Sequence, residues 1–131
     1  MKKVLVLLLL MVSTNVFAEW LRLGEVDDGD STFYVDLETI KRKGNKVKMW
    51  DLSDSKTVKK TLGGKEYFSS LNRIEYDCEE ETRRILDAYR YSGNMKNGGI
   101  VFSYPNVKDE AESIIPESLD DGLFKIACGK K

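Results

Sequence analysis

The sequence predicts an α+β domain: a single small antiparallel β-sheet with one C-terminal helix packed on it and tied to it by a disulfide. Three observations lead to this prediction. Residues 67–78 alternate between apolar and charged side chains, as a half-buried strand does. Residues 119–127 place apolar side chains at helical spacing. The two cysteines, Cys78 and Cys128, stand at the ends of these two segments.

Strand patterns account for most of the chain ahead of the helix. Residues 46–52 carry apolar side chains on both faces, which is typical of a central strand. We interpret residues 53–65 as a long, polar, basic loop, because they show no apolar period and contain Gly63 and Gly64. The predicted strands are residues 20–26, 33–36, 46–52, 67–78, 82–92 and 100–104.

The predicted helix begins after Ser118, which together with Asp121 resembles a capping box with a shorter acid. Gly129 is a natural stop for this helix. We expect Cys128 to bond to Cys78, because two cysteines in an exported chain normally pair. Metal binding by the pair is the competing interpretation. It is disfavoured, since a tetrahedral zinc site takes four ligands and the chain has no histidine.

Residues 1–18 have the pattern of a secretory signal peptide. Two lysines precede an apolar run over residues 4–12, and small residues precede a cleavage site after Ala18. The run is shorter than the roughly twenty residues of a membrane span, although an uncleaved signal anchor is an alternative. The first cysteine is Cys78, which disfavours lipid attachment at the cleavage site. We therefore expect one domain over residues 19–131 that is periplasmic, secreted or on the cell surface, without a membrane span.

The residue content excludes several catalytic constellations. The absence of histidine removes the Ser-His-Asp triad, and paired cysteines leave no thiol nucleophile. Glu75 and Asp77 share one strand face as a carboxylate pair, but charge alternation there is typical of a solvated surface. Residues 27–30 resemble a fragment of a calcium loop without its spaced ligands, so a polar turn is the better interpretation. We predict no catalytic residues, no metal site and no cofactor.

Positive charge is concentrated in residues 41–65, which hold nine basic and two acidic residues, whereas the whole chain has a net charge of −1. This balance argues against a nucleic-acid partner. Lysine-rich segments often only keep a surface soluble, yet such a cluster can also attract an anionic partner. Two clusters flank one hairpin and could form one patch. The candidate residues of this patch are Lys41, Arg42, Lys43, Lys56, Lys59, Lys60 and Lys65.

A set of motifs follows in order along nearly all of the predicted domain. The first half contains Trp20, Tyr34, Val35, Asp36, Ile40, Lys41, Arg42, Gly44, Asn45, Val47 and Trp50. The second half contains Gly64, Lys65, Tyr67, Ser69, Glu75, Tyr76, Asp77, Cys78, Arg83, Arg84, Tyr91, Ser92, Pro116, Ser118, Leu119 and Cys128. In these motifs the sequence resembles the surface-adhesin protein E family. The resemblance implies a small antiparallel sheet with a disulfide-tied C-terminal helix. It also implies an envelope or surface protein, some relatives of which adhere to host matrix proteins.

Three functional hypotheses follow. The favoured one is a non-catalytic, adhesin-like binding module that recognises a protein or polysaccharide of the envelope or host surface through its sheet face and basic loop. The second is a structural or assembly role through an exposed sheet edge or self-association, including a homodimer. The third is a carboxylate-dependent enzyme, which would need a pocket holding two carboxylates.

Overall fold

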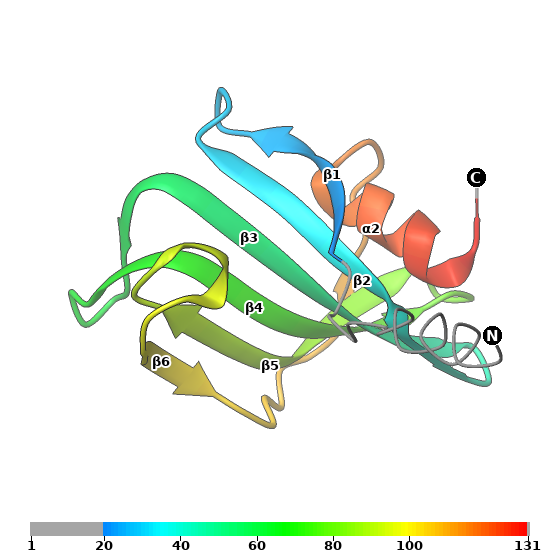
Figure 1. Cartoon of the computed structure of the whole chain (residues 1–131). Coiled ribbons are helices and arrows are strands. Elements are labelled where there is room, and N and C mark those ends of the chain that lie inside the picture. Colours follow the sequence, from blue (N-terminus) through cyan, green and yellow to red (C-terminus); the bar gives the residue numbers. More distant parts are fainter. Residues whose placement is uncertain (1–19, 131) are drawn as a thin grey trace, which may run out of the picture.

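The computed structural model describes residues 20–130, and the predicted signal peptide, residues 1–18, lies outside them. Within the described part the strands are β1 (Leu21–Val26), β2 (Ser31–Lys43), β3 (Lys46–Lys60), β4 (Glu66–Asp77), β5 (Thr82–Tyr91), β6 (Ile100–Tyr104) and β7 (Glu112–Ser113). They form one seven-stranded antiparallel sheet (Figure 1). Strands β1 to β6 are neighbours in chain order, and β7 pairs with the start of β5. The predicted α+β class is thereby confirmed.

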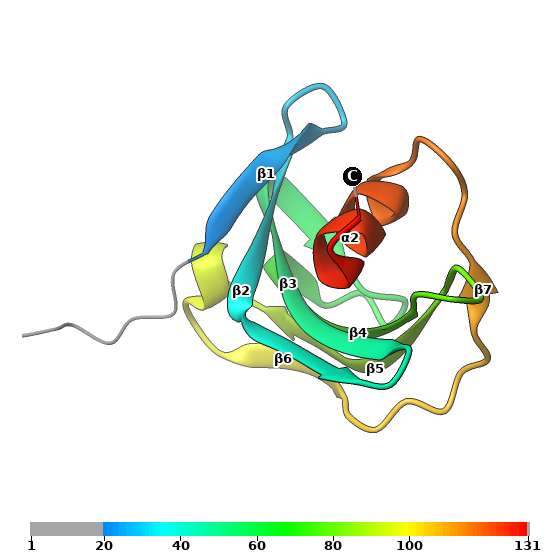
Figure 2. The ribbon, with the colours of Figure 1, turned by 90° about the vertical axis from the view of Figure 1, so that its right-hand side faces the viewer.

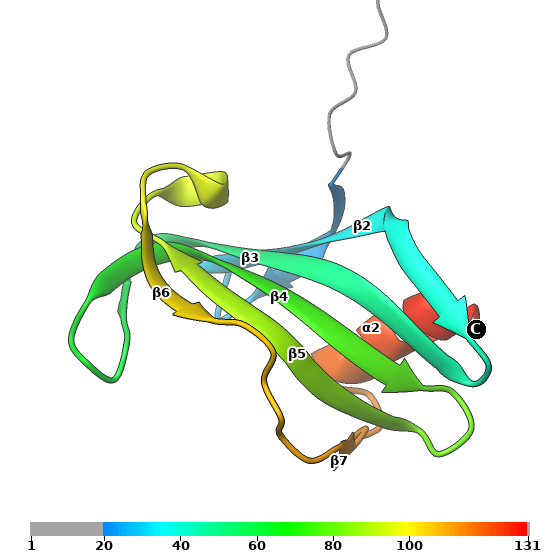
Figure 3. The ribbon, with the colours of Figure 1, turned by 90° about the horizontal axis from the view of Figure 1, so that it is seen from below.

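The sheet curves around the helix α2 (Leu119–Cys128), which lies against its concave face (Figure 2). A short 3₁₀ helix, η2 (Asn94–Lys96), lies over the opposite face (Figure 3). The core fills the space between α2 and the sheet, where Met49 of β3 and Tyr76 of β4 are completely buried. Each large apolar side chain buried there stabilises the fold by about 1.5–3 kcal/mol. No helix of residues 20–130 is long and apolar enough to cross a membrane.

The ends of α2 follow the predicted signals. The side chain of Ser118 accepts a hydrogen bond from the backbone N–H of Asp121 at 3.2 Å. The carboxylate of Asp121 in turn accepts one from the backbone N–H of Glu117 at 2.9 Å, and this bond lowers the pKa of Asp121. Gly129 ends the helix in the left-handed conformation, with φ of 69°. Both termini therefore have partners for backbone groups that a helix leaves unpaired.

The prediction of a loop over residues 53–65 is wrong, because β3 continues to Lys60. The pairing of β3 with β2 extends to Ser55, and its pairing with β4 resumes at Lys59 and Lys60. A register shift between Asp54 and Lys59 interrupts the pairing with β4. Residues 53–60 carry polar side chains on both faces, and they are held extended by β2 as far as Ser55 and by β4 at Lys59 and Lys60. Only Thr61–Lys65 remain as a connection.

Candidate functional site

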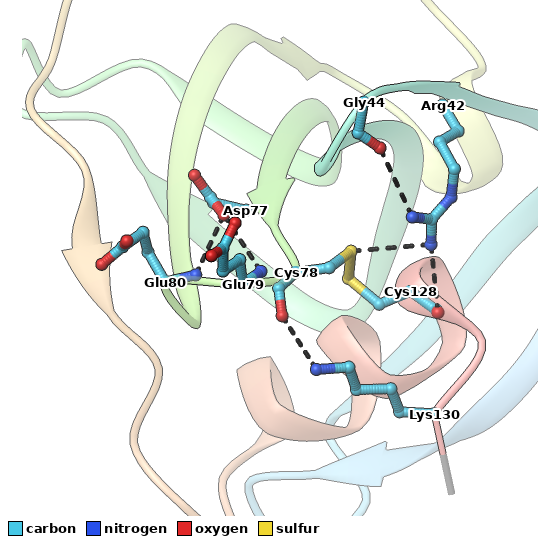
Figure 4. Close-up of a disulfide and its surroundings, with 8 residues drawn as sticks. All are labelled: Arg42, Gly44, Asp77, Cys78, Glu79, Glu80, Cys128 and Lys130. Carbon is cyan, nitrogen blue, oxygen red and sulfur yellow. Dashed lines mark hydrogen bonds between the residues drawn. A yellow bond between two sulfur atoms is a disulfide. The ribbon is translucent and has the colours of Figure 1, made fainter.

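A disulfide and several hydrogen bonds hold the C-terminus of α2 against the end of the sheet (Figure 4). Cys78 follows β4 and Cys128 ends α2, and the predicted disulfide joins them with their Cα atoms 5.7 Å apart. The Nη2 of Arg42 donates to the carbonyl of Cys128 at 3.2 Å and lies 3.8 Å from the Sγ of Cys78. The Nζ of Lys130 donates to the carbonyl of Cys78 at 2.8 Å. Arg42, a residue of the predicted patch, thus helps to hold the end of the helix.

The structure divides the seven predicted basic residues between the two ends of β3 (Figure 1). Lys41, Arg42 and Lys43 lie at the β2–β3 turn, and Lys56, Lys59, Lys60 and Lys65 lie toward the β3–β4 turn. A strand rises about 3.3 Å per residue, so the two ends of β3 are on the order of 40 Å apart. The two groups do not form one patch.

An open groove of about 490 Å³ lies at the β3–β4 end of the sheet. Lys60 and Lys65, which flank the β3–β4 turn, form one side of the groove, and Phe102 of β6 forms the other. Between them lie Tyr67 of β4 and Arg90 of β5, whose guanidinium is 5.6 Å from the centre of the Tyr67 ring. Four strands therefore contribute side chains to one concavity that combines cations with aromatic rings.

The cations of the groove are not neutralised. Among residues 20–130, no carboxylate lies within 4.0 Å of a charged nitrogen of Lys60, Lys65 or Arg90. The neighbouring Lys59 differs, because its Nζ lies 3.0 Å from the Oδ2 of Asp30. The hydrogen bond between them raises the pKa of Lys59 and lowers that of Asp30. Three cations without an ion-pair partner among residues 20–130 therefore line the groove, and Lys56, which also has none there, lies outside it.

A chain of hydrogen bonds leads from the groove into the core. The Nη1 of Arg90 donates to the Oδ1 of Asn72 at 3.2 Å, and the Nδ2 of Asn72 donates to the Oδ1 of Asp51 at 3.2 Å. Asp51 is only 3% exposed. Its burial raises its pKa to about 6, against the opposing effect of the hydrogen bond from Asn72. The position of the Arg90 guanidinium is thus tied to a buried acid.

Charged and polar groups from several elements surround this acid. Arg83 of β5 lowers the pKa of Asp51 and Asp120 of α2 raises it, while Arg90 also lowers it. The Nε of Arg83 lies 3.6 Å from a carboxylate oxygen of Asp120. The hydroxyl of Tyr76 is buried and has no hydrogen-bond partner among residues 20–130, and burial raises its pKa. This polar cluster extends from the buried Asp51 and Tyr76 to Asp120, whose side chain is 43% exposed.

Sequence reasoning did not identify Arg90, Asn72 or Asp51. One signal was present for Asp51, because it follows Val47 and Met49 at alternate positions and so shares their buried strand face. A carboxylate at such a position predicts a buried polar contact. The partner on β4 depends on strand register, which the sequence does not specify.

The predicted carboxylate pair has structural contacts. Glu75 accepts a hydrogen bond from Arg84 at 3.0 Å and lies 3.8 Å from the Nζ of Lys46. Asp77 accepts hydrogen bonds from the backbone N–H groups of the two residues that follow Cys78 (Figure 4). Residues 27–30 form a turn, as predicted. Among residues 20–130, no group of three or more histidine, cysteine or acidic residues is arranged to hold a metal ion.

Comparisons with known proteins agree with this architecture. The family model described as surface-adhesin protein E matches residues 20–129. A structure of crystal form II of Haemophilus influenzae protein E is 16% identical, with 88% of this chain and 91% of that chain covered and a TM-score of 0.66. A structure of protein E from non-typeable Haemophilus influenzae is 15% identical, with 87% and 76% covered and a TM-score of 0.54. No curated protein matches the chain. The likeness to the solved structures shows the fold, and the family match, which spans most of the sequence, shows that the chain belongs to the surface-adhesin protein E family.

Proposed function

We propose that this protein is an exported, non-catalytic binding module of the adhesin type that recognises an anionic partner, a protein or a polysaccharide, through the groove at the β3–β4 end of the sheet. The observation that carries the proposal is the meeting of Lys60, Lys65 and Arg90, all without an ion-pair partner among the described residues, with Tyr67 and Phe102 around one concavity. The seven-residue patch expected from the sequence is reduced in this proposal to its two groove residues, Lys60 and Lys65.

The arrangement suits recognition of an anion. Like charges that line a concavity reinforce one another's field and speed the arrival of an oppositely charged partner. The aromatic rings of Tyr67 and Phe102 add apolar contact area. Arg90 is held by Asn72 before any partner arrives, which reduces the entropy that binding must overcome. The volume falls in the range of about 300–1,000 Å³ that is typical of binding sites.

Export is supported by the signal-peptide pattern of residues 1–18 and by the family, which is described as a surface adhesin. We place the protein in the periplasm, in the secreted fraction or on the cell surface. A non-catalytic role is supported by Glu75 and Asp77, whose carboxylates are engaged in an ion pair and in turn hydrogen bonds.

A second candidate function is assembly through self-association, including a homodimer. It is favoured by β6, at the edge of the sheet, where Ile100, Phe102 and Tyr104 are 53%, 40% and 50% exposed. An unpaired edge with apolar side chains can pair with the same edge of another copy. Sedimentation velocity over a hundredfold range of concentration tests this function directly.

The binding proposal is tested by charge reversal at one end of the sheet and not the other. The groove variant, Lys60→Glu with Lys65→Glu, reverses the charge of the two groove lysines. The control variant, Lys41→Glu with Lys43→Glu, changes the net charge by the same amount at the opposite end of β3. The probes are a heparin-derived octasaccharide and poly-glutamate. At low salt we expect the groove variant, Lys60→Glu with Lys65→Glu, to associate with the probe that the wild type binds at least about tenfold more slowly than the wild type does. The association rate of the control variant should stay within about twofold of the wild-type rate. Equal association of the two variants would contradict the proposal.

A further inference from the structure

The outer edge of β6 has no strand beside it among the described residues, although a register shift between Phe102 and Ile100 interrupts its pairing with β5. β6 is the last strand of the sheet path, and among the described residues it pairs only with β5. The opposite side of β6 therefore has no partner strand there, and backbone N–H and C=O groups on that side are free to pair with an added strand. Protein sheets usually protect such an edge with charged residues or proline. Residues 100–104 contain neither; Pro105 follows directly, so the unprotected part of the edge is Phe102–Tyr104, beyond the register shift.

Side chains beside this edge favour apolar contact. Ile100, Phe102 and Tyr104 occupy alternate positions of β6 and are all exposed. The rings of Phe102 and Tyr104 lie edge to face with their centres 6.2 Å apart. Phe102 and Tyr104 pair with Arg90 and Ala88 of β5, so they share the strand face that leads into the groove.

The charged side chains near β6 and in the groove favour a partner with acidic side chains. Residues 92–107 contain Lys96 and no acidic residue. Arg90 pairs directly with Phe102, and Lys60 and Lys65 lie across the groove; none of the three has an ion-pair partner among residues 20–130. An acidic segment that lies along β6 therefore meets Arg90 as the nearest groove cation, and residues 92–107 place no carboxylate beside it.

We infer that the outer edge of β6 takes an extended, acidic segment of a partner polypeptide, which adds to the sheet as a further strand and directs acidic side chains toward the groove. This inference rests on the proposed function, since it names the kind of anionic partner that the groove serves. Strand addition supplies main-chain hydrogen bonds, and alternate side chains supply selectivity. An added strand lies about 4.8 Å from β6, so its side chains on the groove face pack directly beside Phe102 and Tyr104.

A polypeptide fits these features better than a polysaccharide. From Phe102 to Tyr104 the free edge offers donors and acceptors at the two-residue repeat of an extended peptide, and the exposed rings of these two residues have the same repeat. A polysaccharide would use the cations of the groove and leave the edge without a partner.

The test uses the whole domain with its disulfide intact and needs no protein variant. The probe is a capped heptapeptide of alternating valine and glutamate. A second peptide has lysine in place of glutamate, and a third is the valine–glutamate peptide methylated on alternate backbone nitrogens. Hydrogen exchange is measured by NMR for the amides of residues 100–104 and, as a matched control, for β1 (Leu21–Val26) at the other edge of the sheet.

We expect the valine–glutamate peptide to slow exchange at residues 100–104 by at least about tenfold and to leave β1 unchanged. The methylated peptide and the lysine peptide should bind at least about tenfold more weakly, since one lacks the main-chain donors and the other the charge. Protection that survives methylation would overturn strand addition.

Other outcomes separate this inference from the proposed function. If the heparin-derived octasaccharide binds with sensitivity to Lys60→Glu and Lys65→Glu while no peptide protects β6, the inference fails and the proposed function stands. If none of the anionic probes binds, both fail. If residues 100–104 become protected as the protein concentration rises without any peptide, a second copy occupies the edge and the inference is overturned.

Discussion

Replacing Asp51 with asparagine should stabilise the protein at neutral pH. Asp51 is buried, and its pKa is raised from 3.8 to about 6, mainly because burial disfavours the charged form. A raised folded-state pKa means that the folded state binds the proton more tightly than the unfolded state. The contribution of Asp51 to stability therefore falls as the pH rises from about 4 to about 6 and stays low above that. About two pKa units at 1.36 kcal/mol each give a cost of about 3 kcal/mol at pH 7.

Asparagine has nearly the same shape, and its carbonyl oxygen can still accept the hydrogen bond from Asn72. We expect Asp51→Asn to raise the free energy of unfolding by up to about 3 kcal/mol at pH 7 and to have little effect near pH 4. Urea titrations at pH 4, 5, 6 and 7, followed by the fluorescence of Trp50 and Trp20, measure this difference. The exposed Asp28→Asn serves as a control that removes the same charge without burial.

The reasoning is refuted if the stability difference between Asp51→Asn and the wild type is the same at every pH. It is also refuted if the variant is less stable than the wild type at pH 7. The second outcome would mean that the attraction of Arg83 and Arg90 exceeds the cost of burying the carboxylate.

Three further predictions concern the ends of the chain and of the helix. Replacing Cys78 and Cys128 together with serine should lower the free energy of unfolding by about 2–5 kcal/mol in urea titrations, and an unchanged value would show that the disulfide does not stabilise the fold. Ser118→Ala should lower it by about 1 kcal/mol, because the N–H of Asp121 loses its acceptor, whereas Ser118→Asp should retain most of the stability. Exported protein should begin at residue 19 by intact-mass analysis, and a mass that retains residues 1–18 or an added lipid would contradict cleavage after Ala18.

The sequence was sufficient where local chemistry and packing agree. The alternation of β4 placed Ile74, Tyr76 and Cys78 on one face, and all three are buried. The signals of Ser118 and Gly129 fixed both ends of α2. In these segments the alternation of apolar residues and the capping residues are local signals. They predict the strand face and the helix ends without knowledge of the rest of the chain.

The sequence was insufficient where structure depends on pairing between distant strands. The second half of β3 carries no apolar period, and it is extended because β2 pairs with it as far as Ser55 and β4 pairs with it again at Lys59 and Lys60. The groove depends on the same pairing, since Lys60 and Arg90 come together only through the register of β3, β4 and β5. The prediction of one basic patch failed for a related reason. Strand β3 extends to Lys60, and its length places the two basic groups at opposite ends of the sheet.

The most direct test of the binding account places a photo-crosslinking amino acid at Leu62, the fully exposed residue of the β3–β4 turn that lines the groove. A matched variant carries it at the exposed Lys43, at the opposite end of β3. Both variants are irradiated with envelope extract and with host-surface extract, and the adducts are compared by mass spectrometry. The account predicts a recurrent adduct at position 62, lost in high salt, and none at position 43. An adduct of the same partner at position 43 and not at position 62 would contradict it.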